Sequence, residues 1–345
     1  ADYFRTHRMR FTPVVIEQAE EIRAAFVAGS SLPSLPRQIE GPSIPPPLCP
    51  TRTAAMEKLK IGVSACLLGQ NVRYNGGHQL NHFIRDILGQ YMEFVPVCPE
   101  VECGLPIPRE TLRLVGSEEA PRLVTSRSGV DHTEQMQSWA ATRVKQLEQE
   151  GLCGFIFKKD SPSSGLYRVK VYSEQGMPRN VGTGMFARAF TEHFPLLPVE
   201  EDGRLNDGRL RENFIESVFV CKHFRDLTAA PPSRGALVDF HTRHKLLFLA
   251  RSQEHYRRMG RFIANLPASI DEAYSQYGTL MADTLRVRTT AKKHCNVLLH
   301  VLGYFKKMLS ADEKQEALEL IEAYRTADVP LIVPITLLNH FVRKY

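Results

Sequence analysis

Two cysteines and a serine-rich loop are the residues of this sequence best suited to chemistry. Cys66 ends one apolar run, and Cys98 ends another and is followed closely by Glu100. A third apolar run leads into Ser161-Pro162-Ser163-Ser164-Gly165. Thiolates are soft ligands suited to zinc or iron–sulfur centres, and a carboxylate can move protons. No Cys-x-x-Cys zinc pair is present, so the residues favour thiolate ligation beside an acid–base group over a zinc finger.

Three expected strands position these residues. Residues 61–66, 93–98 and 152–157 each read as a buried strand, and residues 133–147 read as a helix with Thr133 as its cap. Strands that alternate with helices predict a mainly parallel, Rossmann-like α/β sheet. Loops at the carboxyl ends of parallel strands converge on one crevice, so we expect the cysteines, Glu100 and the serine loop to meet there. Taken singly, each piece has a plainer interpretation, because such cysteines usually fill a core and loop serines usually cap helices.

Polar residues near these loops are candidates for binding a substrate. Arg73 and Lys158 can face a phosphate or a carbonyl oxygen, and Asn75 opens an Asn-Gly-Gly turn whose glycines permit close backbone approach. The alternative for Asn75-Gly76-Gly77 is an ordinary tight turn, and the alternative for Lys158 and Lys159 is a solvated pair on a loop.

The chain divides into three blocks. Residues 1–57 are expected to be a Pro-rich N-terminal extension, with seven prolines between Pro33 and Pro50 and one short helix over 14–27, and the folded part is expected to begin near Met56. Residues 58–230 form the α/β block. After a boundary at 231–235, residues 236–345 are expected to form an all-α domain. Its helices are expected over 240–264, 270–285, 291–309 and 312–324, with a capping box at Ser310 and Glu313.

Composition excludes several protein classes. The 345 residues are 43% hydrophobic and 24% charged, which is typical of a soluble globular protein. No apolar run reaches the ~18 residues of a membrane helix, and the first residues lack the features of a signal peptide. Seven cysteines are an odd number and too thinly spread for a disulfide framework. We therefore expect a cytoplasmic protein with no membrane partner.

The positive charge is concentrated in the last third of the chain. Residues 236–345 carry 16 basic and 11 acidic residues, a surplus of +5 out of a net +6. Such a surplus suggests a polyanionic partner, although it can equally serve solubility. The candidate RNA-binding residues are Arg286, Arg288, Lys292, Lys293, Lys306 and Lys307.

The motifs that surround these residues resemble a known family. Residues 61–74 (IGVSACLLGQNVRY), 97–108 (VCPEVECGLPIP) and 154–165 (GFIFKKDSPSSG) resemble the thiouracil desulfurase (TudS) family. The segment from about residue 237 resembles the helical domain of YbgA-like proteins and of tRNA 4-thiouridine desulfidases (RudS). The resemblance implies a [4Fe–4S] cluster held by three cysteines, with one iron open to the sulfur of a thiolated pyrimidine. It further implies that Cys66 and Cys98 are cluster ligands, that Glu100 transfers protons and that Ser161 assists in the pocket.

One position departs from the family motif. Ser164 stands where the family has its third cysteine, and a serine hydroxyl stays protonated at neutral pH and is a harder ligand than a thiolate. We expect poor cluster retention, or a labile or two-cysteine cluster, or rescue by Cys103 or Cys153.

The leading interpretation is a desulfidase that acts on 4-thiouridine in tRNA, with the helical domain facing the RNA. The alternatives are a desulfurase of free thiouracil or thionucleosides, and a non-catalytic RNA-binding or redox-sensing protein.

Overall fold

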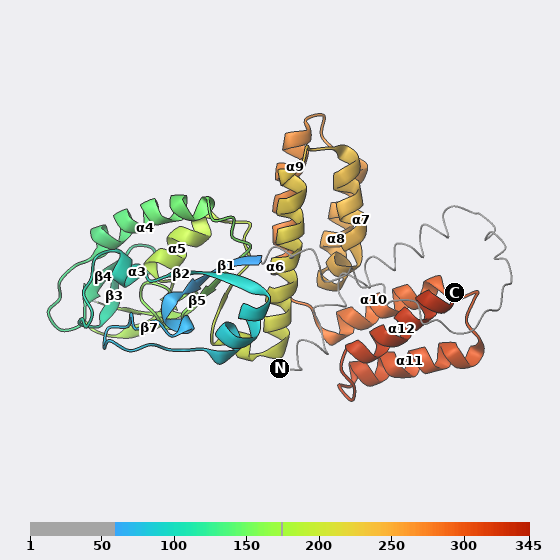
Figure 1. The fold of residues 1–345 in the computed structure, drawn as a ribbon, viewed down its shortest axis with the longest axis horizontal. Helices are drawn as coiled ribbons and strands as arrows, with labels where there is room; N and C mark the ends of the chain where they lie inside the picture. Colours follow the sequence, from blue (N-terminus) through green and yellow to red (C-terminus); the bar gives the residue numbers. More distant parts are fainter. Residues whose placement is uncertain (1–58, 174) are drawn as a thin grey trace.

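The computed structural model describes residues 59–173 and 175–345, and it shows an α/β domain followed by an all-helical region (Figure 1). This confirms the predicted fold class. The expected Pro-rich extension over 1–57 and its helix lie outside the described residues. Among the helices that are described, none has both the length and the apolar character needed to cross a bilayer.

A four-stranded parallel sheet forms the centre of the α/β domain. Its strand order is β2-β1-β5-β8, with every neighbouring pair parallel. The strands are β1 (Leu59–Ser64), β2 (Met92–Val97), β5 (Phe155–Phe157) and β8 (Val199–Glu201). The predicted strands 61–66 and 93–98 correspond to β1 and β2, while β5 is shorter than the predicted 152–157. In the sheet, β2 lies on one side of β1 and β5 lies on the other. The direction in which successive strands are added therefore reverses at β1, and a crevice opens there at the carboxyl ends of the strands.

Helices cover both faces of this sheet. On one face, α4 (Thr133–Glu148) and α5 (Met185–His193) pack against β2 and β5 through a core that includes Phe155, Phe186 and Phe190. On the other face, α6 (Gly208–Ala229) packs Phe214 and Val218 against β1. A parallel sheet buried on both faces needs nearly continuous apolar strands, and this is why β1 and β5 could be predicted from their sequences.

A second sheet was not predicted. It has mixed pairing in the order β4-β3-β6-β7, and its strands are β3 (Leu112–Gly116), β4 (Pro121–Thr125), β6 (Val169–Tyr172) and β7 (Pro178–Gly182). The helix α4 begins at Thr133, but Thr133 is not its cap, contrary to prediction. The Thr133 hydroxyl instead accepts a hydrogen bond from the Leu123 amide (2.8 Å), which ties α4 to β4.

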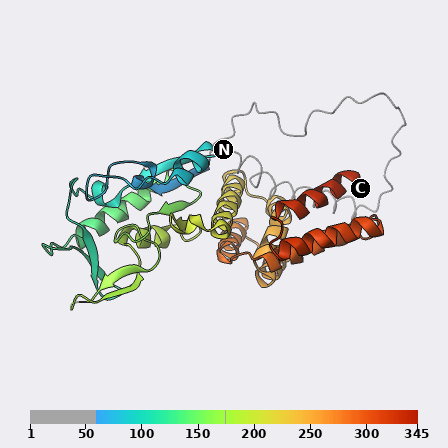
Figure 2. The same ribbon diagram turned by 90° about the horizontal axis from the view of Figure 1, so that it is seen from below.

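The C-terminal part is helical throughout the described residues. It comprises α7 (Arg234–Arg251), α8 (Gln253–Ala264), α9 (Ile270–Arg286), α10 (Ala291–Tyr304), α11 (Ala311–Arg325) and α12 (Ile332–Lys344). The predicted single helix over 240–264 is wrong, because Ser252 adopts an extended conformation (φ −159°, ψ 125°) and caps α8 through its hydroxyl. The predicted Ser310–Glu313 capping box is confirmed. In Figure 2 the red helices α11 and α12 lie at the end of the molecule farthest from the α/β domain.

The helix α6 belongs to two cores. Its first half packs on the parallel sheet, while Val220 and Phe224 join the core of α7, α8 and α9. Figure 1 shows α6 standing between the two parts of the molecule. A single 22-residue helix therefore fixes the helical region to the domain that carries the crevice.

Candidate functional site

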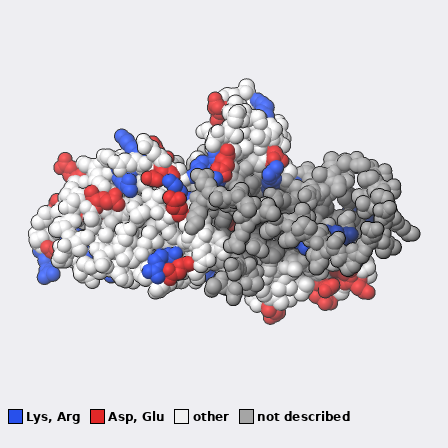
Figure 3. Space-filling view, in the orientation of Figure 1, with Lys and Arg blue, Asp and Glu red and all other residues white. Residues whose placement is uncertain are grey.

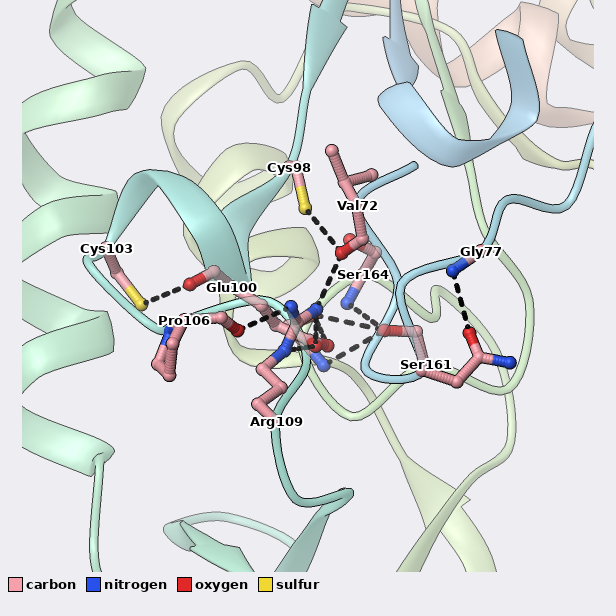
Figure 4. Close-up of polar contacts among 11 residues, drawn as sticks. Val72, Gly77, Cys98, Glu100, Cys103, Pro106, Arg109, Ser161 and Ser164 are labelled. Carbon is pink, nitrogen blue, oxygen red and sulfur yellow. Dashed lines mark hydrogen bonds and ion pairs between the residues drawn. The ribbon is translucent and has the colours of Figure 1, made fainter. Parts of the chain in front are cut away.

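A pocket of about 480 Å³ lies at the carboxyl ends of the parallel strands. The segments that line it follow β1, β2 and β5. This agrees with the prediction that loops at the carboxyl ends of parallel strands converge on one crevice. Cys66, Cys98, Glu100, Ser161 and Ser164 all line the pocket. Figure 4 shows the part of this group around Cys98, Glu100, Ser161 and Ser164.

Both pocket cysteines are held as protonated thiols. Cys66 lies in a short 3-10 turn, η1 (Ala65–Leu68), where burial raises the pKa of its thiol to about 11. Cys98 precedes the short helix α3 (Pro99–Glu102), and burial also raises the pKa of its thiol. Its Sγ donates to the Val72 carbonyl (3.9 Å). A metal centre that used these sulfurs would have to displace both protons.

Glu100 is the centre of the polar network in the pocket. Its Oε2 forms an ion pair with Arg109, whose Nε donates at 2.9 Å, and its Oε1 accepts from the Ser163 hydroxyl at 2.9 Å. Because Ser163 gives its only hydroxyl proton to Glu100, the Ser161 hydroxyl must be the donor in the 3.0 Å bond between the two serines. The result is a chain of hydrogen bonds that runs from Ser161 through Ser163 to the carboxylate. Such a chain can deliver a proton to a bound group or remove one from it.

The serine loop is fixed by its own backbone and by close packing. The Ser161 hydroxyl accepts from the amide of Ser164 at 3.2 Å. Gly184, at the start of α5, approaches so closely that a Cβ there would lie 2.6 Å from the Ser163 carbonyl. Gly165 is equally confined, because its Cβ would lie 2.4 Å from Val169 Cγ2. The hydroxyls are therefore presented to the pocket by a tightly packed turn.

The donor set fits an iron–sulfur cluster at two of three positions. Cys66 and Cys98 supply thiols, while Ser164 supplies a hydroxyl that makes no hydrogen bond among the described residues. Neither alternative ligand compensates, because Cys103 and Cys153 are buried and do not line the pocket. The Cys103 thiol instead donates to the Glu100 carbonyl (3.3 Å). Within the described chain, no group of three His, Cys, Asp or Glu side chains is arranged to hold a metal ion.

The predicted substrate-binding residues fall into two groups. Arg73 and Lys158 line the pocket, and the Lys158 ammonium group pairs with Asp202 at 3.2 Å. Asn75 does not line the pocket. Its side chain accepts from the Gly77 amide at 3.1 Å and shapes the turn, as Figure 4 shows at Gly77.

The predicted RNA-binding residues lie at the two ends of α10. Arg286 and Arg288 precede α10, Lys292 and Lys293 are in its first turn, and Lys306 and Lys307 follow its end. Lys293 is engaged inside the protein, since its ammonium group donates to the carbonyls of Arg251 (2.6 Å) and Arg288 (2.7 Å). Arg286 pairs with Asp283 at 2.9 Å and also donates to the Pro195 carbonyl of the α/β domain.

Three contributors to the site were not among the predicted site residues. Arg109 and Ser163 hold Glu100, and Asp202 holds both Lys158 and the Lys159 amide (2.8 Å). Asp202 directly follows β8. If the short strand Val-Glu-Glu had been recognised in the sequence, Asp202 would have been predicted as a site residue, because residues after parallel strands converge on the crevice. Arg109 follows a loop rather than a strand, and no comparable signal marks it.

Comparison with known proteins places these features in a family. Residues 61–202 match the 2-thiouracil desulfurase family, and residues 245–345 match DUF1722, a protein family of unknown function. The chain is 34% identical over 143 residues to the uncharacterized protein YbgA of Escherichia coli (strain K12), which covers 41% of this chain and 85% of YbgA. It is 32% identical over 108 residues to the uncharacterized protein YbbK of Bacillus subtilis (strain 168), which covers 30% of this chain and 71% of YbbK.

One solved structure is also similar in sequence. It is the [4Fe-4S]-dependent thiouracil desulfidase TudS, with 31% identity, a TM-score of 0.36, and coverage of 44% of this chain and 95% of that one. By the matches of its two parts and its identity to YbgA, the chain belongs to the YbgA-like family and joins a 2-thiouracil desulfurase domain to a DUF1722 domain.

Proposed function

We propose that this protein removes the sulfur from a thiolated uracil, and that its substrate is 4-thiouridine in tRNA, which becomes uridine. The observation that carries the proposal is the convergence of Cys66, Cys98, Glu100 and Ser161 in one pocket of a 2-thiouracil desulfurase domain. In the net reaction, water gives its oxygen to the thiocarbonyl carbon, the C–S bond breaks and the sulfur leaves as hydrogen sulfide. Protons must therefore pass from the water to the departing sulfur.

The residues around Glu100 are suited to this proton movement. Glu100 takes a proton from the attacking water, and the hydroxyls of Ser163 and Ser161 form the hydrogen-bonded path that leads from the carboxylate into the pocket. Arg109 keeps the carboxylate oriented, because it also donates to the Val72 carbonyl at 2.9 Å and is thereby fixed in place. Lys158, fixed by Asp202, offers a cation to a uracil oxygen or a phosphate.

The proposal includes a [4Fe–4S] cluster held by Cys66, Cys98 and the oxygen of Ser164. When bound, such a cluster supplies a thiophilic iron that attracts the thiocarbonyl sulfur. With an oxygen at the third position, we expect weaker retention than with three thiolates, because a serine hydroxyl is a harder ligand that stays protonated at neutral pH.

The test measures sulfide release after anaerobic reconstitution with iron and sulfide. The wild type and Ser164→Cys are each incubated with tRNA that carries 4-thiouridine and with free 2-thiouracil. Glu100→Gln should slow release by about 100-fold, the size of a lost acid–base group, whereas Glu93→Gln, a surface acid on β2, should not. If neither protein releases sulfide from either substrate, the proposal is wrong. If only free 2-thiouracil reacts, the tRNA part of it is wrong.

A further inference from the structure

An exposed tyrosine stands beside the pocket with an arginine over its ring. Tyr167 follows the serine loop by only two residues, and it remains 41% exposed. The guanidinium of Arg204 lies 4.7 Å from the centre of the Tyr167 ring. An aromatic ring and an arginine in this arrangement resemble the surfaces on which proteins stack unpaired bases.

Both members of this pair are held by the end of β8. Glu201 accepts hydrogen bonds from the backbone amides of Leu166 (2.8 Å) and Tyr167 (3.0 Å). Glu200, which is buried, forms the ion pair that orients Arg204. The ring and the guanidinium are thus arranged before any ligand arrives, which lowers the entropic cost of stacking on them.

The pair adjoins the rim of the pocket. Gly203, which directly precedes Arg204, packs on the side chain of Lys159, and a Cβ at Gly203 would lie 2.5 Å from Lys159 Cδ. Lys159 lines the pocket. A polynucleotide with one base in the pocket would therefore pass close to Tyr167 and Arg204.

The loop between α9 and α10 of the helical region is attached to the α/β domain. This loop is anchored at both ends, by Arg286 on the Pro195 carbonyl and by Lys293 on the Arg288 carbonyl. In the view of Figure 3, basic and acidic side chains are interspersed over the described surface of the α/β domain.

From these contacts we propose that Tyr167 and Arg204 form a stacking platform for an RNA base next to the target nucleotide. The inference rests on the proposed function, because it assumes that the base entering the pocket belongs to an RNA chain.

The test measures binding of the full chain to an unmodified tRNA transcript, which has no sulfur to lose. Stacking on an aromatic side chain is worth about 1–3 kcal/mol per base, so Tyr167→Ala should weaken binding by about 5-fold to 150-fold. Tyr167→Phe keeps the ring and should bind within about twofold of the wild type. Tyr345→Ala is the matched control, since Tyr345 is also 41% exposed and has Lys344 5.1 Å from its ring centre.

The outcomes separate this inference from the proposed function. If Tyr167→Ala binds like the wild type, or if Tyr345→Ala loses as much, there is no platform at Tyr167. If the wild type does not bind the transcript at all, the inference is also overturned, while release of sulfide from free 2-thiouracil would still support the desulfurase. Conversely, selective loss of binding in Tyr167→Ala would uphold the platform even if the wild type released no sulfide.

Discussion

The ion pair between Arg109 and Glu100 organises the pocket, and its contribution can be measured as a change in the free energy of unfolding. Their side chains are 6% and 16% exposed, and Arg109 also donates to the carbonyls of Val72 (2.9 Å) and Pro106 (3.3 Å). Arg109→Met removes the charge and the donors but keeps much of the apolar stem. Glu100 then retains only its bond to Ser163 among these partners. Removing one partner of a buried pair costs about 3–5 kcal/mol, and because Glu100 keeps slight contact with solvent we expect about 3 kcal/mol.

The single tryptophan of the chain provides the assay. Trp139 lies on α4 with its ring 5.2 Å from that of Phe186, inside the α/β domain. Its fluorescence during urea unfolding therefore reports the domain that holds the pocket. Arg122→Met is the matched control within the same domain, because Arg122 of β4 and Asp131 form a surface pair with side chains 54% and 42% exposed. An exposed pair contributes about 0–1 kcal/mol, so the control should stay within that range.

Two results would refute the reasoning about this pair. The first is a loss of less than about 1 kcal/mol in Arg109→Met, equal to that of the surface control. The second concerns the double variant Arg109→Met/Glu100→Gln, which no longer leaves a charge without its partner. It should be more stable than Arg109→Met alone, since most of the penalty comes from the orphaned carboxylate. If it is not, the carboxylate is not the source of the cost.

Three further predictions concern the cluster, the loop and pH. Ser164→Cys should retain more iron per chain than the wild type after anaerobic reconstitution and gel filtration. Cys295→Ser, outside the pocket, should retain as much iron as the wild type. Equal retention by the wild type and Ser164→Cys would contradict the prediction. Gly165→Ala should destabilise the α/β domain by about 1–3 kcal/mol in the same fluorescence assay, because the new Cβ would lie 2.8 Å from the Ser161 carbonyl. An unchanged urea midpoint would show that the turn relaxes and would contradict the prediction. Burial lowers the pKa of both His241 and His244 to about 4, from the usual 6.5 of a histidine, so the unfolded chain binds protons first as pH falls. Stability of the helical region should be complete above pH 6.5 and decline towards pH 4, by about 1.4 kcal/mol per unit for each histidine, and a flat urea midpoint by circular dichroism over that range would count against it.

The two sheets differ in how visible they are in the sequence. The strands β1 and β5 are buried on both faces and read as short apolar runs, so the two strands and the parallel character of their sheet could be predicted. In contrast, β7 has the sequence Pro-Arg-Asn-Val-Gly and is mostly exposed, and β8 carries two acids in three residues. Neither shows the alternation or the apolar run that marks a strand. The division of α7 from α8 was missed because no glycine or proline marks Ser252.

The same distinction applies to the pocket. Cys66, Cys98 and Ser161 could be predicted to meet because each follows a parallel strand, and strand ends converge whatever their side chains are. Arg109 could not, because its place depends on how a loop folds back to bring its guanidinium to Glu100. What sequence reasoning misses here is the set of groups that orient the reacting residues.

The helical region is more than an appendage to the desulfurase domain. Arg251 of α7 is fully buried and donates to the Asn213 carbonyl (3.0 Å) and Glu216 carboxylate (3.0 Å) of α6 and to the Leu285 carbonyl (3.3 Å) of α9. The same α6 packs Phe214 on the parallel sheet, so a displacement of α9 acts on the wall of the α/β domain. The hydrogen bonds of this buried arginine therefore tie α6, α7 and α9 together. Cutting the chain after α6 would expose the face of α6 that α7–α9 cover, so the two domains are best tested as one protein.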